Sequence, residues 1–305
     1  MTFTLPSMRA AAVTEHEAAT PARGFPRWGW AGLVLLVASW VGAWLPTHPL
    51  SGLGFFTLWF GFILVLDGLN FWRRGASILH DQPWKFAQLF VFSVPFWWLF
   101  EAFNARVQNW QYHLDRPFGL TWSPLAYNVM ATLCFSTVLP VVMEMTALFT
   151  SFPVFRPRLA RGLPEPKVAR GTLIAEFAGG VLAIALPLVW PHYAFGLIWV
   201  GPMLLLDAVN AALGRRSAIG HFVARDRRFV AALALATLAC GFFWEMWNYW
   251  SLPKWSYTVP FVGFGKVFEM PILGFMGYLP FGVELFALYQ FLLWLTRQHD
   301  DALPF

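Results

Sequence analysis

The chain alternates between long apolar runs and short polar segments. Eight of the runs are about 20 residues long, the length that an α-helix needs to cross the hydrocarbon core of a bilayer. They cover roughly residues 28–45, 54–73, 86–105, 125–150, 171–190, 194–213, 229–249 and 268–295. Pro271 and Pro280 interrupt the last run, so we expect a broken helix there. The pattern predicts an all-α fold, a polytopic transmembrane helix bundle with about eight spans.

Composition supports this interpretation. Of the 305 residues, 58% are hydrophobic and 12% are charged, whereas a soluble domain has roughly 25% charged residues. The net charge of +5 therefore does not indicate a nucleic-acid partner, and the expected partner is the lipid bilayer. Cys134 and Cys240 lie in different apolar runs, so we expect neither a disulfide framework nor a site of paired cysteines for zinc.

Positively charged residues are distributed unevenly among the loops. All Lys and Arg residues except Arg106, Arg116, Lys254 and Lys266 fall in segments on the side of the N-terminus. Because cytoplasmic loops carry such an excess, we expect a multi-pass protein of the bacterial cytoplasmic (inner) membrane with both termini in the cytoplasm. In this topology, residues 1–27 form a cytoplasmic tail unlike a signal peptide. Residues 151–170 form a basic cytoplasmic linker, and residues 297–305 form a second tail.

The two halves of the chain repeat the same polar and aromatic residues in the same order. The matched pairs are Asp67 and Asp207, Asn70 and Asn210, Glu101 and Glu245, Asn104 and Asn248, Trp110 and Trp255, Tyr112 and Tyr257, and Glu144 and Glu284, each separated by 140 to 145 residues. The recurrence predicts an internal duplication with four-helix repeats over 28–150 and 171–296. Since four is an even number of spans, the repeats are expected to be parallel, with any shared site between them.

Carboxylic acids occur in most of the predicted spans, although a charged side chain at the bilayer centre costs about 2.5–3.5 kcal/mol. A secondary acid layer lies toward the cytoplasmic ends of the spans and contains Asp67, Glu144, Asp207 and Glu284. An outer layer contains Glu101, Glu245 and Glu269. Hydrogen bonding between helices that fixes their packing is an equally good interpretation of the secondary layer.

The outer acids lie among aromatic residues, which favours a catalytic interpretation. A carboxyl group desolvated among rings can keep its proton near neutral pH, as a general acid must, and ring faces stabilise cations. We predict catalytic roles for Glu101, Glu245 and Glu269. We predict substrate binding by Asn104, Asn248, Trp97, Trp244, Trp247 and Tyr257. The alternative is that the aromatic residues only anchor the protein at the membrane interfaces.

The sequence predicts neither a metal nor a cofactor. His80 and His221 are single residues in separate loops, which is not the clustering that a metal site needs. A Gly-rich phosphate loop, HExxH, GxSxG and an Asp-rich prenyl-diphosphate motif are all missing from the sequence.

One part of the second half resembles a known family. The segment FWEMWNYWSLPKWSY, followed by VFEMP, is similar to the integral-membrane lycopene cyclase domain of the heterodimeric or fused type. In that resemblance, Glu245 after Trp244 takes the place of the family's Trp-Asp pair, Trp255 and Tyr257 form its Trp-x-Tyr element, and Glu269 belongs to its acidic opening of the next helix. The resemblance implies two related units and cofactor-independent acid–base chemistry on a carotenoid or another isoprenoid.

Three functions remain open at this stage. The first is an integral-membrane enzyme, a lyase or isomerase, in which Glu101, Glu245 and Glu269 donate and recover a proton during isomerisation, cyclisation or hydration of an apolar isoprenoid or other lipid. The second is a proton- or cation-coupled transporter or channel with acids along the symmetry axis. The third is a structural membrane protein. The sequence leaves the substrate and the oligomeric state open.

Overall fold

The computed structural model describes residues 24–45, 54–113, 123–157, 165–251 and 253–298. The predicted tails at 1–27 and 297–305 and the linker at 151–170 therefore lie partly outside the described residues. The first half contains α1 (Arg27–Trp44), α2 (Gly54–Arg74), α3 (Ile78–Asp81), α4 (Pro83–Val107), β1 (Trp110–His113), α5 (Pro124–Phe135) and α6 (Val138–Thr150). The second half contains α7 (Arg170–Val189), α8 (Pro191–Ala194), η3 (Phe195–Trp199), α9 (Gly201–Ala212), α10 (Ala218–Val223), α11 (Arg228–Tyr249), β2 (Lys254–Tyr257), β3 (Lys266–Val267), β4 (Met270–Pro271), η4 (Ile272–Gly277) and α12 (Tyr278–Leu295).

The fold is an all-α bundle, as the sequence predicts. Each of the eight apolar runs is helical over most of its length. Within the described residues, six helices are long and apolar enough to cross a membrane, and the bent pair Pro191–Trp199 and Gly201–Ala212 would make a seventh. Helix α1 is not among the six, so the structure does not by itself give the eight predicted spans.

Proline residues explain where the predicted runs break. Pro140 and Pro280 are each the third residue of a helix, α6 and α12, where a missing N–H breaks no helical hydrogen bond. The last run differs from the prediction at its start. Residues 268–271 are not helical, because β4 and the 3-10 turn η4 precede α12.

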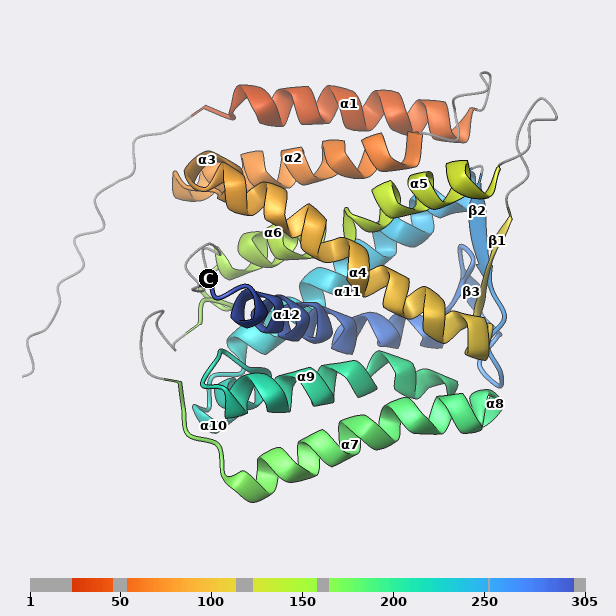
Figure 1. Cartoon of the computed structure of the whole chain (residues 1–305). Coiled ribbons are helices and arrows are strands. Elements are labelled where there is room, and N and C mark those ends of the chain that lie inside the picture. The colour runs from red at the N-terminus through yellow and green to blue at the C-terminus, as the bar shows by residue number, and fades with distance from the viewer. Residues whose placement is uncertain (1–23, 46–53, 114–122, 158–164, 252, 299–305) are drawn as a thin grey trace, which may run out of the picture.

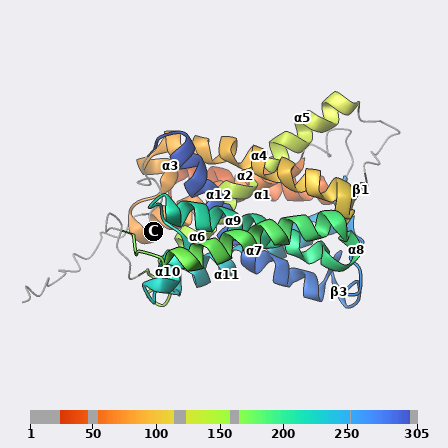
Figure 2. The ribbon, with the colours of Figure 1, turned by 60° about the horizontal axis from the view of Figure 1, so that its bottom comes forward.

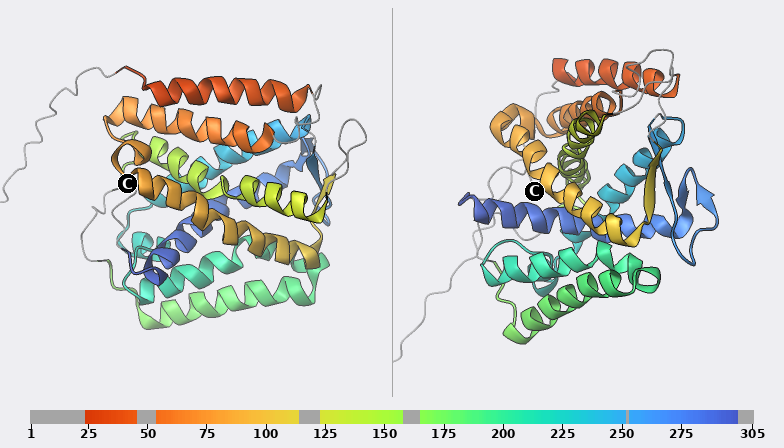
Figure 3. Two further views of the ribbon diagram at one scale, coloured as in Figure 1. Left: turned by 45° about the horizontal axis from the view of Figure 1, so that its top comes forward. Right: turned by 45° about the vertical axis from the view of Figure 1, so that its right-hand side comes forward.

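The long helices form an outer pair on each side of a central group. Helix α1 lies along α2 in one pair, and α7 lies along α9 in the other (Figure 1). In Figure 1, α1 and α2 lie at the top, α7 and α9 lie at the bottom, and α4, α6, α11 and α12 lie between them. Both views of Figure 3 show the same order, and Figure 2 shows α7 in front of the central group. At the left of Figure 1, α7 begins with Arg170 and α11 begins with Arg228. Helix α2 ends on the same side of Figure 1 with Arg73 and Arg74. We call this the basic end of the bundle and the opposite one the sheet end.

Both outer pairs are closely packed at a glycine in the second helix. A Cβ on Gly61 would lie 2.7 Å from the backbone nitrogen of Leu36 in α1. A Cβ on Gly201, which is 140 residues further along, would lie 2.9 Å from the backbone nitrogen of Ile184 in α7. Only glycine permits these approaches, since real Cβ contacts are not found below 3.0 Å.

The two halves pack across each other through tryptophans 140 residues apart. The ring of Trp59 in α2 lies 5.1 Å from Trp244 and 4.9 Å from Trp247, both in α11. The ring of Trp199 in η3 stacks on Phe100 in α4 at 4.7 Å. Helix α2 of the first half therefore contacts α11 of the second half, and η3 of the second half contacts α4 of the first half. Each aromatic pair adds about 0.5–1.5 kcal/mol to the energy of burial.

A two-stranded ribbon also joins the halves. Strands β1 and β2 pair in antiparallel fashion, with Trp110 opposite Tyr257 and Tyr112 opposite Trp255. The ribbon lies at the sheet end, to the right in Figure 1. The sequence does not predict this pairing, because strands of four residues carry little periodicity.

Candidate functional site

Two asparagines fix the ribbon to the long helices. Oδ1 of Asn104 accepts hydrogen bonds from the backbone N–H groups of Asn109 and Trp110, and its Nδ2 donates to the Trp110 carbonyl at 2.8 Å. Asn248 makes the corresponding contacts with Trp255, accepting from its N–H at 2.8 Å and donating to its carbonyl at 2.7 Å. Each amide thus satisfies both polar backbone groups of one tryptophan. The two clamps position the Trp-x-Tyr elements beside the acids one turn earlier on α4 and α11.

Glu101 accepts three hydrogen bonds on one oxygen. Its Oε1 accepts from Trp97 Nε1 at 3.0 Å, from Trp110 Nε1 at 3.1 Å and from the Tyr112 hydroxyl at 2.7 Å. Trp97 lies one helical turn before the acid, and the other two donors come from β1. All three donors are neutral, so they hold the carboxyl group in place without the positive charge of an ion pair.

Glu245 is fully buried and is held by two phenols. Its Oε1 accepts from the hydroxyls of Tyr257 and Tyr278, both at 2.7 Å. Trp255 Nε1 in turn donates to the Tyr257 oxygen at 2.7 Å. The second carboxyl oxygen, Oε2, is buried and has no hydrogen-bond partner within the described residues. Both phenol hydrogen bonds therefore fall on one oxygen of Glu245, and among the described residues only that oxygen is hydrogen-bonded to residues that line a path out of the site.

The two acid sites differ in one of their hydrogen-bond donors, which is Trp97 at Glu101 and Tyr278 at Glu245. Trp97 corresponds in the second half to Gly241, which has no side chain to donate. The ring of Tyr278 fills this space, since a Cβ on Gly241 would lie 2.4 Å from its Cδ2 atom. The residue that corresponds to Tyr278 in the first half is Val138. An indole from the acid's own helix thus serves Glu101, whereas a phenol from α12 serves Glu245.

The phenols of the ribbon keep their protons. Burial raises the pKa of Tyr112 and of Tyr257 well above the usual range, and the neighbouring carboxyls, Glu101 and Glu245 respectively, raise them further. Because neither phenol ionises near neutral pH, both can donate to the acids at every physiological pH.

Both acid sites border one cavity of about 450 Å³ between the halves. Its wall includes every side chain that donates directly to either acid, and these are Trp97, Trp110, Tyr112, Tyr257 and Tyr278. The rest of the wall is mainly aromatic, aliphatic and sulfur-containing, with no Lys, Arg, Asp, Glu or His among the described residues that form it. The volume lies within the roughly 300–1,000 Å³ of small-molecule sites. Glu101 and Glu245 lie behind this wall, each separated from the cavity by its donors.

Of the predicted substrate-binding residues, three line the cavity and three do not. Trp97, Trp244 and Tyr257 belong to its wall. Asn104 and Asn248 instead hold the ribbon strands, as described above. Trp247 is buried in the contact between α2 and α11, where its ring lies 5.2 Å from that of Phe62. Spacing along the helix does not distinguish Trp244, which lines the cavity, from Trp247, which lies in a packed core.

Glu269 lies apart from the hydrogen-bond networks of the other two acids. It forms an ion pair with Lys254 at 2.6 Å, and Lys266 lies 4.0 Å from its other oxygen. The pair closes the loop between β2 and β4. The described contacts thus give Glu269 a local structural partner, and its predicted catalytic role stays a prediction.

Two members of the secondary acid layer hold the turn that follows their helix. Asp67 accepts from the Ser77 hydroxyl at 2.8 Å and from the backbone N–H of Leu79 at 2.8 Å. Asp207 accepts from the backbone N–H groups of Ala218 and Ile219 at 2.6 and 2.8 Å. In each half the carboxylate meets the free N–H groups at the start of a short helix, α3 or α10, where negative charge is stabilising.

The two glutamates of the same layer differ from each other. Glu144 accepts from Asn70 Nδ2 at 2.8 Å, so this pair joins α6 to α2. The matching Asn210 donates to the carbonyl of Ala287 instead, at 2.7 Å. Glu284 is fully buried, and neither of its oxygens has a hydrogen-bond partner within the described residues. The hydrogen-bonding interpretation of this layer therefore describes three of its acids and leaves Glu284 unexplained.

Tyr278 and Trp199 are site residues that the sequence analysis did not identify. Tyr278 has no aromatic counterpart in the first half, so the comparison of halves gave no signal for it. Trp199 does have a counterpart, Trp59, at the interval of 140 residues that also separates Asp67 from Asp207 and Glu144 from Glu284. A search for matched aromatic residues within the predicted spans would have found that pair.

Metal binding and similarity to known proteins add no further constraint. Across the parts of the chain that the structure describes, no group of three or more His, Cys, Asp and Glu residues is arranged to hold a metal ion. Comparisons with family models, with curated proteins and with solved structures found no match. The resemblance to the lycopene cyclase domain thus stays a prediction.

Proposed function

We propose that the protein is an integral-membrane enzyme that uses buried carboxylic acids for acid–base chemistry on an apolar isoprenoid or another lipid. The reaction class is an isomerisation, a cyclisation or a hydration. The observation that carries the proposal is that Tyr257 and Tyr278 both donate to the buried Glu245 and both line the cavity between the halves. These phenols connect a proton store that is shielded from water with a chamber whose wall suits hydrocarbon.

A phenol allows Glu245 to act on a substrate that it does not touch. When Glu245 carries a proton, the 2.7 Å contact with Tyr257 can reverse, so that the acid donates to the phenol oxygen. The phenol hydrogen then moves to one carbon of a double bond, and the adjacent carbon becomes a carbocation. In an isomerisation or cyclisation, a neighbouring carbon returns a proton to the tyrosine and glutamate pair, which ends as it began. In a hydration, water adds to the cation, and the resulting oxonium group loses one proton to the tyrosine and glutamate pair, which again ends as it began.

The aromatic wall supports a cationic intermediate. Trp199 and Phe281 lie edge to face at 5.7 Å, and Trp244 stacks on Tyr278 at 5.9 Å. A cation over such a ring gains about 2 kcal/mol or more when water is excluded. The wall offers a carbocation ring faces and no competing fixed charge among its described residues.

The proposal includes the finer topology. It places the enzyme in the bacterial cytoplasmic membrane, with both termini in the cytoplasm and two parallel four-helix repeats around the cavity. The basic end of the bundle supports this orientation, and the matched clamps of Asn104 and Asn248 support the two repeats. Eight spans result if α1 and the bent pair of α8–η3 and α9 are added to the six long apolar helices. The resemblance to lycopene cyclases points to an isoprenoid with double bonds.

The test compares lipid extracts of cells that contain the wild-type protein, Glu245→Gln or no protein. We expect the wild type alone to change the lipid profile and Glu245→Gln to abolish the change while the protein stays in the membrane. Tyr257→Phe and Tyr278→Phe should impair product formation, whereas Tyr249→Phe, a matched control at a residue 36% exposed, should not. Full product formation by Glu245→Gln would overturn the proposal. If Glu101→Gln and Glu245→Gln change stability only, the function is structural.

A proton-coupled transporter is the second candidate, and Glu284 is the observation that favours it. A fully buried acid without a hydrogen-bond partner in the described structure is what a proton relay within a membrane needs. Flux across proteoliposomes without any chemical change in the solute, lost in Glu284→Gln and kept in Glu245→Gln, would decide for transport.

A further inference from the structure

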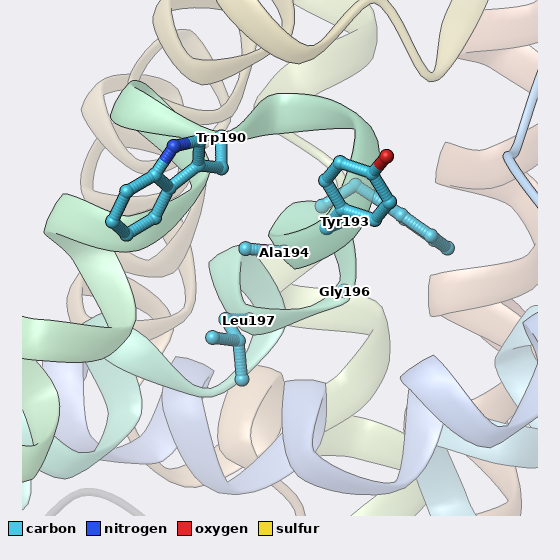
Figure 4. A pocket seen from close by; sticks show the side chains of 6 residues that line it. Trp190, Tyr193, Ala194, Gly196 and Leu197 are labelled. Carbon is cyan, nitrogen blue, oxygen red and sulfur yellow. The ribbon is translucent and has the colours of Figure 1, made fainter.

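A second hollow lies on the outside of the second half, where the helical segment after α7 turns back into the bundle. It has a volume of about 630 Å³ and is lined by Trp190, Tyr193, Ala194, Phe195, Gly196 and Leu197. We call it the lateral groove. Trp190 and Tyr193 project on either side of the stretch that carries Ala194, Gly196 and Leu197 (Figure 4). The groove lies at the sheet end of α7, where α8 and η3 connect α7 to α9.

The lateral groove adjoins the cavity between the halves. Phe195 and Gly196 line both hollows, so a single short stretch of η3 separates them. This stretch belongs to the bent pair of helices, which turns by 40° between η3 and α9. The bend leaves η3 lying between the outer surface and the acid sites, instead of continuing a straight span.

The chemistry of the groove suits the edge of a bilayer. Trp190 is 59% exposed and Tyr193 is 77% exposed, and both residue types favour the level of the lipid headgroups. None of the described residues that line the groove carries a charge. The neighbouring α7 is a long apolar helix with only three buried residues, so most of its surface is free to face lipid.

We propose that the lateral groove is the entrance through which an apolar lipid passes from the bilayer into the cavity, with Phe195 as its gate. The occupant is the hydrocarbon chain of a lipid dissolved in the leaflet at the sheet end. Three observations support this choice: the uncharged lining, the interfacial Trp and Tyr, and the two residues shared with the cavity. The inference rests on the proposed function, because it supplies the route to the acid sites.

Gly196 offers a direct way to close the route. A Cβ on this glycine would meet no atom within 4 Å, and its φ is not in the left-handed region, so a larger residue fits without backbone strain. Gly42 in α1 has the same properties and lines neither hollow. Gly196→Leu and Gly42→Leu are therefore a matched pair of variants.

The experiment uses the full chain in lipid vesicles and a small uncharged aryl diazirine that partitions into the bilayer. After illumination, mass spectrometry locates the adducts. Phe281, 1% exposed, and Trp110, 4% exposed, report on the cavity, because neither has enough exposed surface to meet lipid directly. Trp84, 84% exposed, reports on the outer surface. We expect labelling at all three sites in the wild type.

The variants decide the route. We expect Gly196→Leu to reduce cavity labelling severalfold at unchanged Trp84 labelling, and Gly42→Leu to leave both unchanged. Phe195→Ala should increase cavity labelling, which keeps the test decisive if Gly196→Leu fails to fold. Equal cavity labelling in wild type, Gly196→Leu and Phe195→Ala overturns the entrance, as does a wild type labelled only on its outer surface. The assay needs no turnover, so its result is independent of the lipid-extract test of Glu245→Gln.

Discussion

Exchanging one donor should convert the acid site of the second half into the form found in the first half. Glu245 receives a phenol from Tyr278, whose ring fills the space beside Gly241. At the matching positions of the first half, Trp97 supplies the donor and Val138 leaves room for it. We therefore expect Gly241→Trp and Tyr278→Val to be harmful separately and to compensate each other when combined.

The contacts give the size of each effect. Tyr278→Val removes one hydrogen bond, worth about 1–2 kcal/mol in a membrane protein, and leaves a void that costs about 2–4 kcal/mol more. Gly241→Trp inserts a large side chain where a Cβ alone would approach Tyr278 to 2.4 Å, and such overpacking costs about 1–3 kcal/mol or more. In the double variant the introduced indole can occupy the void and donate to Glu245, so we expect a favourable coupling of about 2–3 kcal/mol.

The free energy of unfolding can be measured by SDS titration in mixed micelles, with far-UV circular dichroism as the signal. The double variant should be more stable than Tyr278→Val alone. The matched control combines Tyr278→Val with Gly42→Trp, on a surface without the acid, and should show no coupling. If the losses of the two single variants simply add in the double variant, the indole and the phenol are not interchangeable and the reasoning is wrong.

Three further predictions concern stability. Asn248→Ala leaves both backbone groups of Trp255 unpaired in a buried site and should lower the free energy of unfolding by about 2–4 kcal/mol in SDS titration. Burial lowers the pKa of His221 from its usual 6.5 to about 4, and Arg216 adds to this effect while Asp226 opposes it. Stability from this residue is therefore fully present above pH 6.5 and is lost as the pH falls through 4, by about 3 kcal/mol in total, and His221→Phe should flatten that part of the pH profile of thermal unfolding. Glu284→Met replaces a buried acid that has no hydrogen-bond partner among the described residues with an apolar side chain, and it should raise the thermal midpoint, whereas an unchanged or lowered midpoint would show that Glu284 has a partner.

The helices could be predicted from the sequence because the bilayer imposes a length and a composition on each of them. All eight apolar runs are helical, and Pro140 and Pro280 mark the start of α6 and α12. The predicted last run was wrong over residues 268–271, where a turn and β4 replace helix, and η4 is a 3-10 helix before α12. Four-residue strands such as β1 and β2 depend on partners from distant parts of the chain, so no local pattern predicts their register.

The acids of the site could also be predicted, but their surroundings could not. A carboxyl group in an apolar run is visible in any sequence, and the interval between Glu101 and Glu245 pairs them. Which side chains separate them from the cavity depends on tertiary contacts. Tyr278 reaches Glu245 from another helix, and Asn248 turns out to hold a strand, although its spacing from Glu245 equally suits a ligand contact.

In the ribbon of β1 and β2, Trp110 pairs with Tyr257 and Tyr112 pairs with Trp255. Each strand therefore offers its partner a tryptophan and a tyrosine in the same arrangement. A polypeptide of half this length would carry an edge that is complementary to a second copy of itself. Gene fusion of such a homodimer would give one chain in which each ancestral edge is already matched, and each copy could then change on its own. In such a history, the indole of Trp97 and the phenol of Tyr278 would be two different solutions to binding the matching acid, one in each copy.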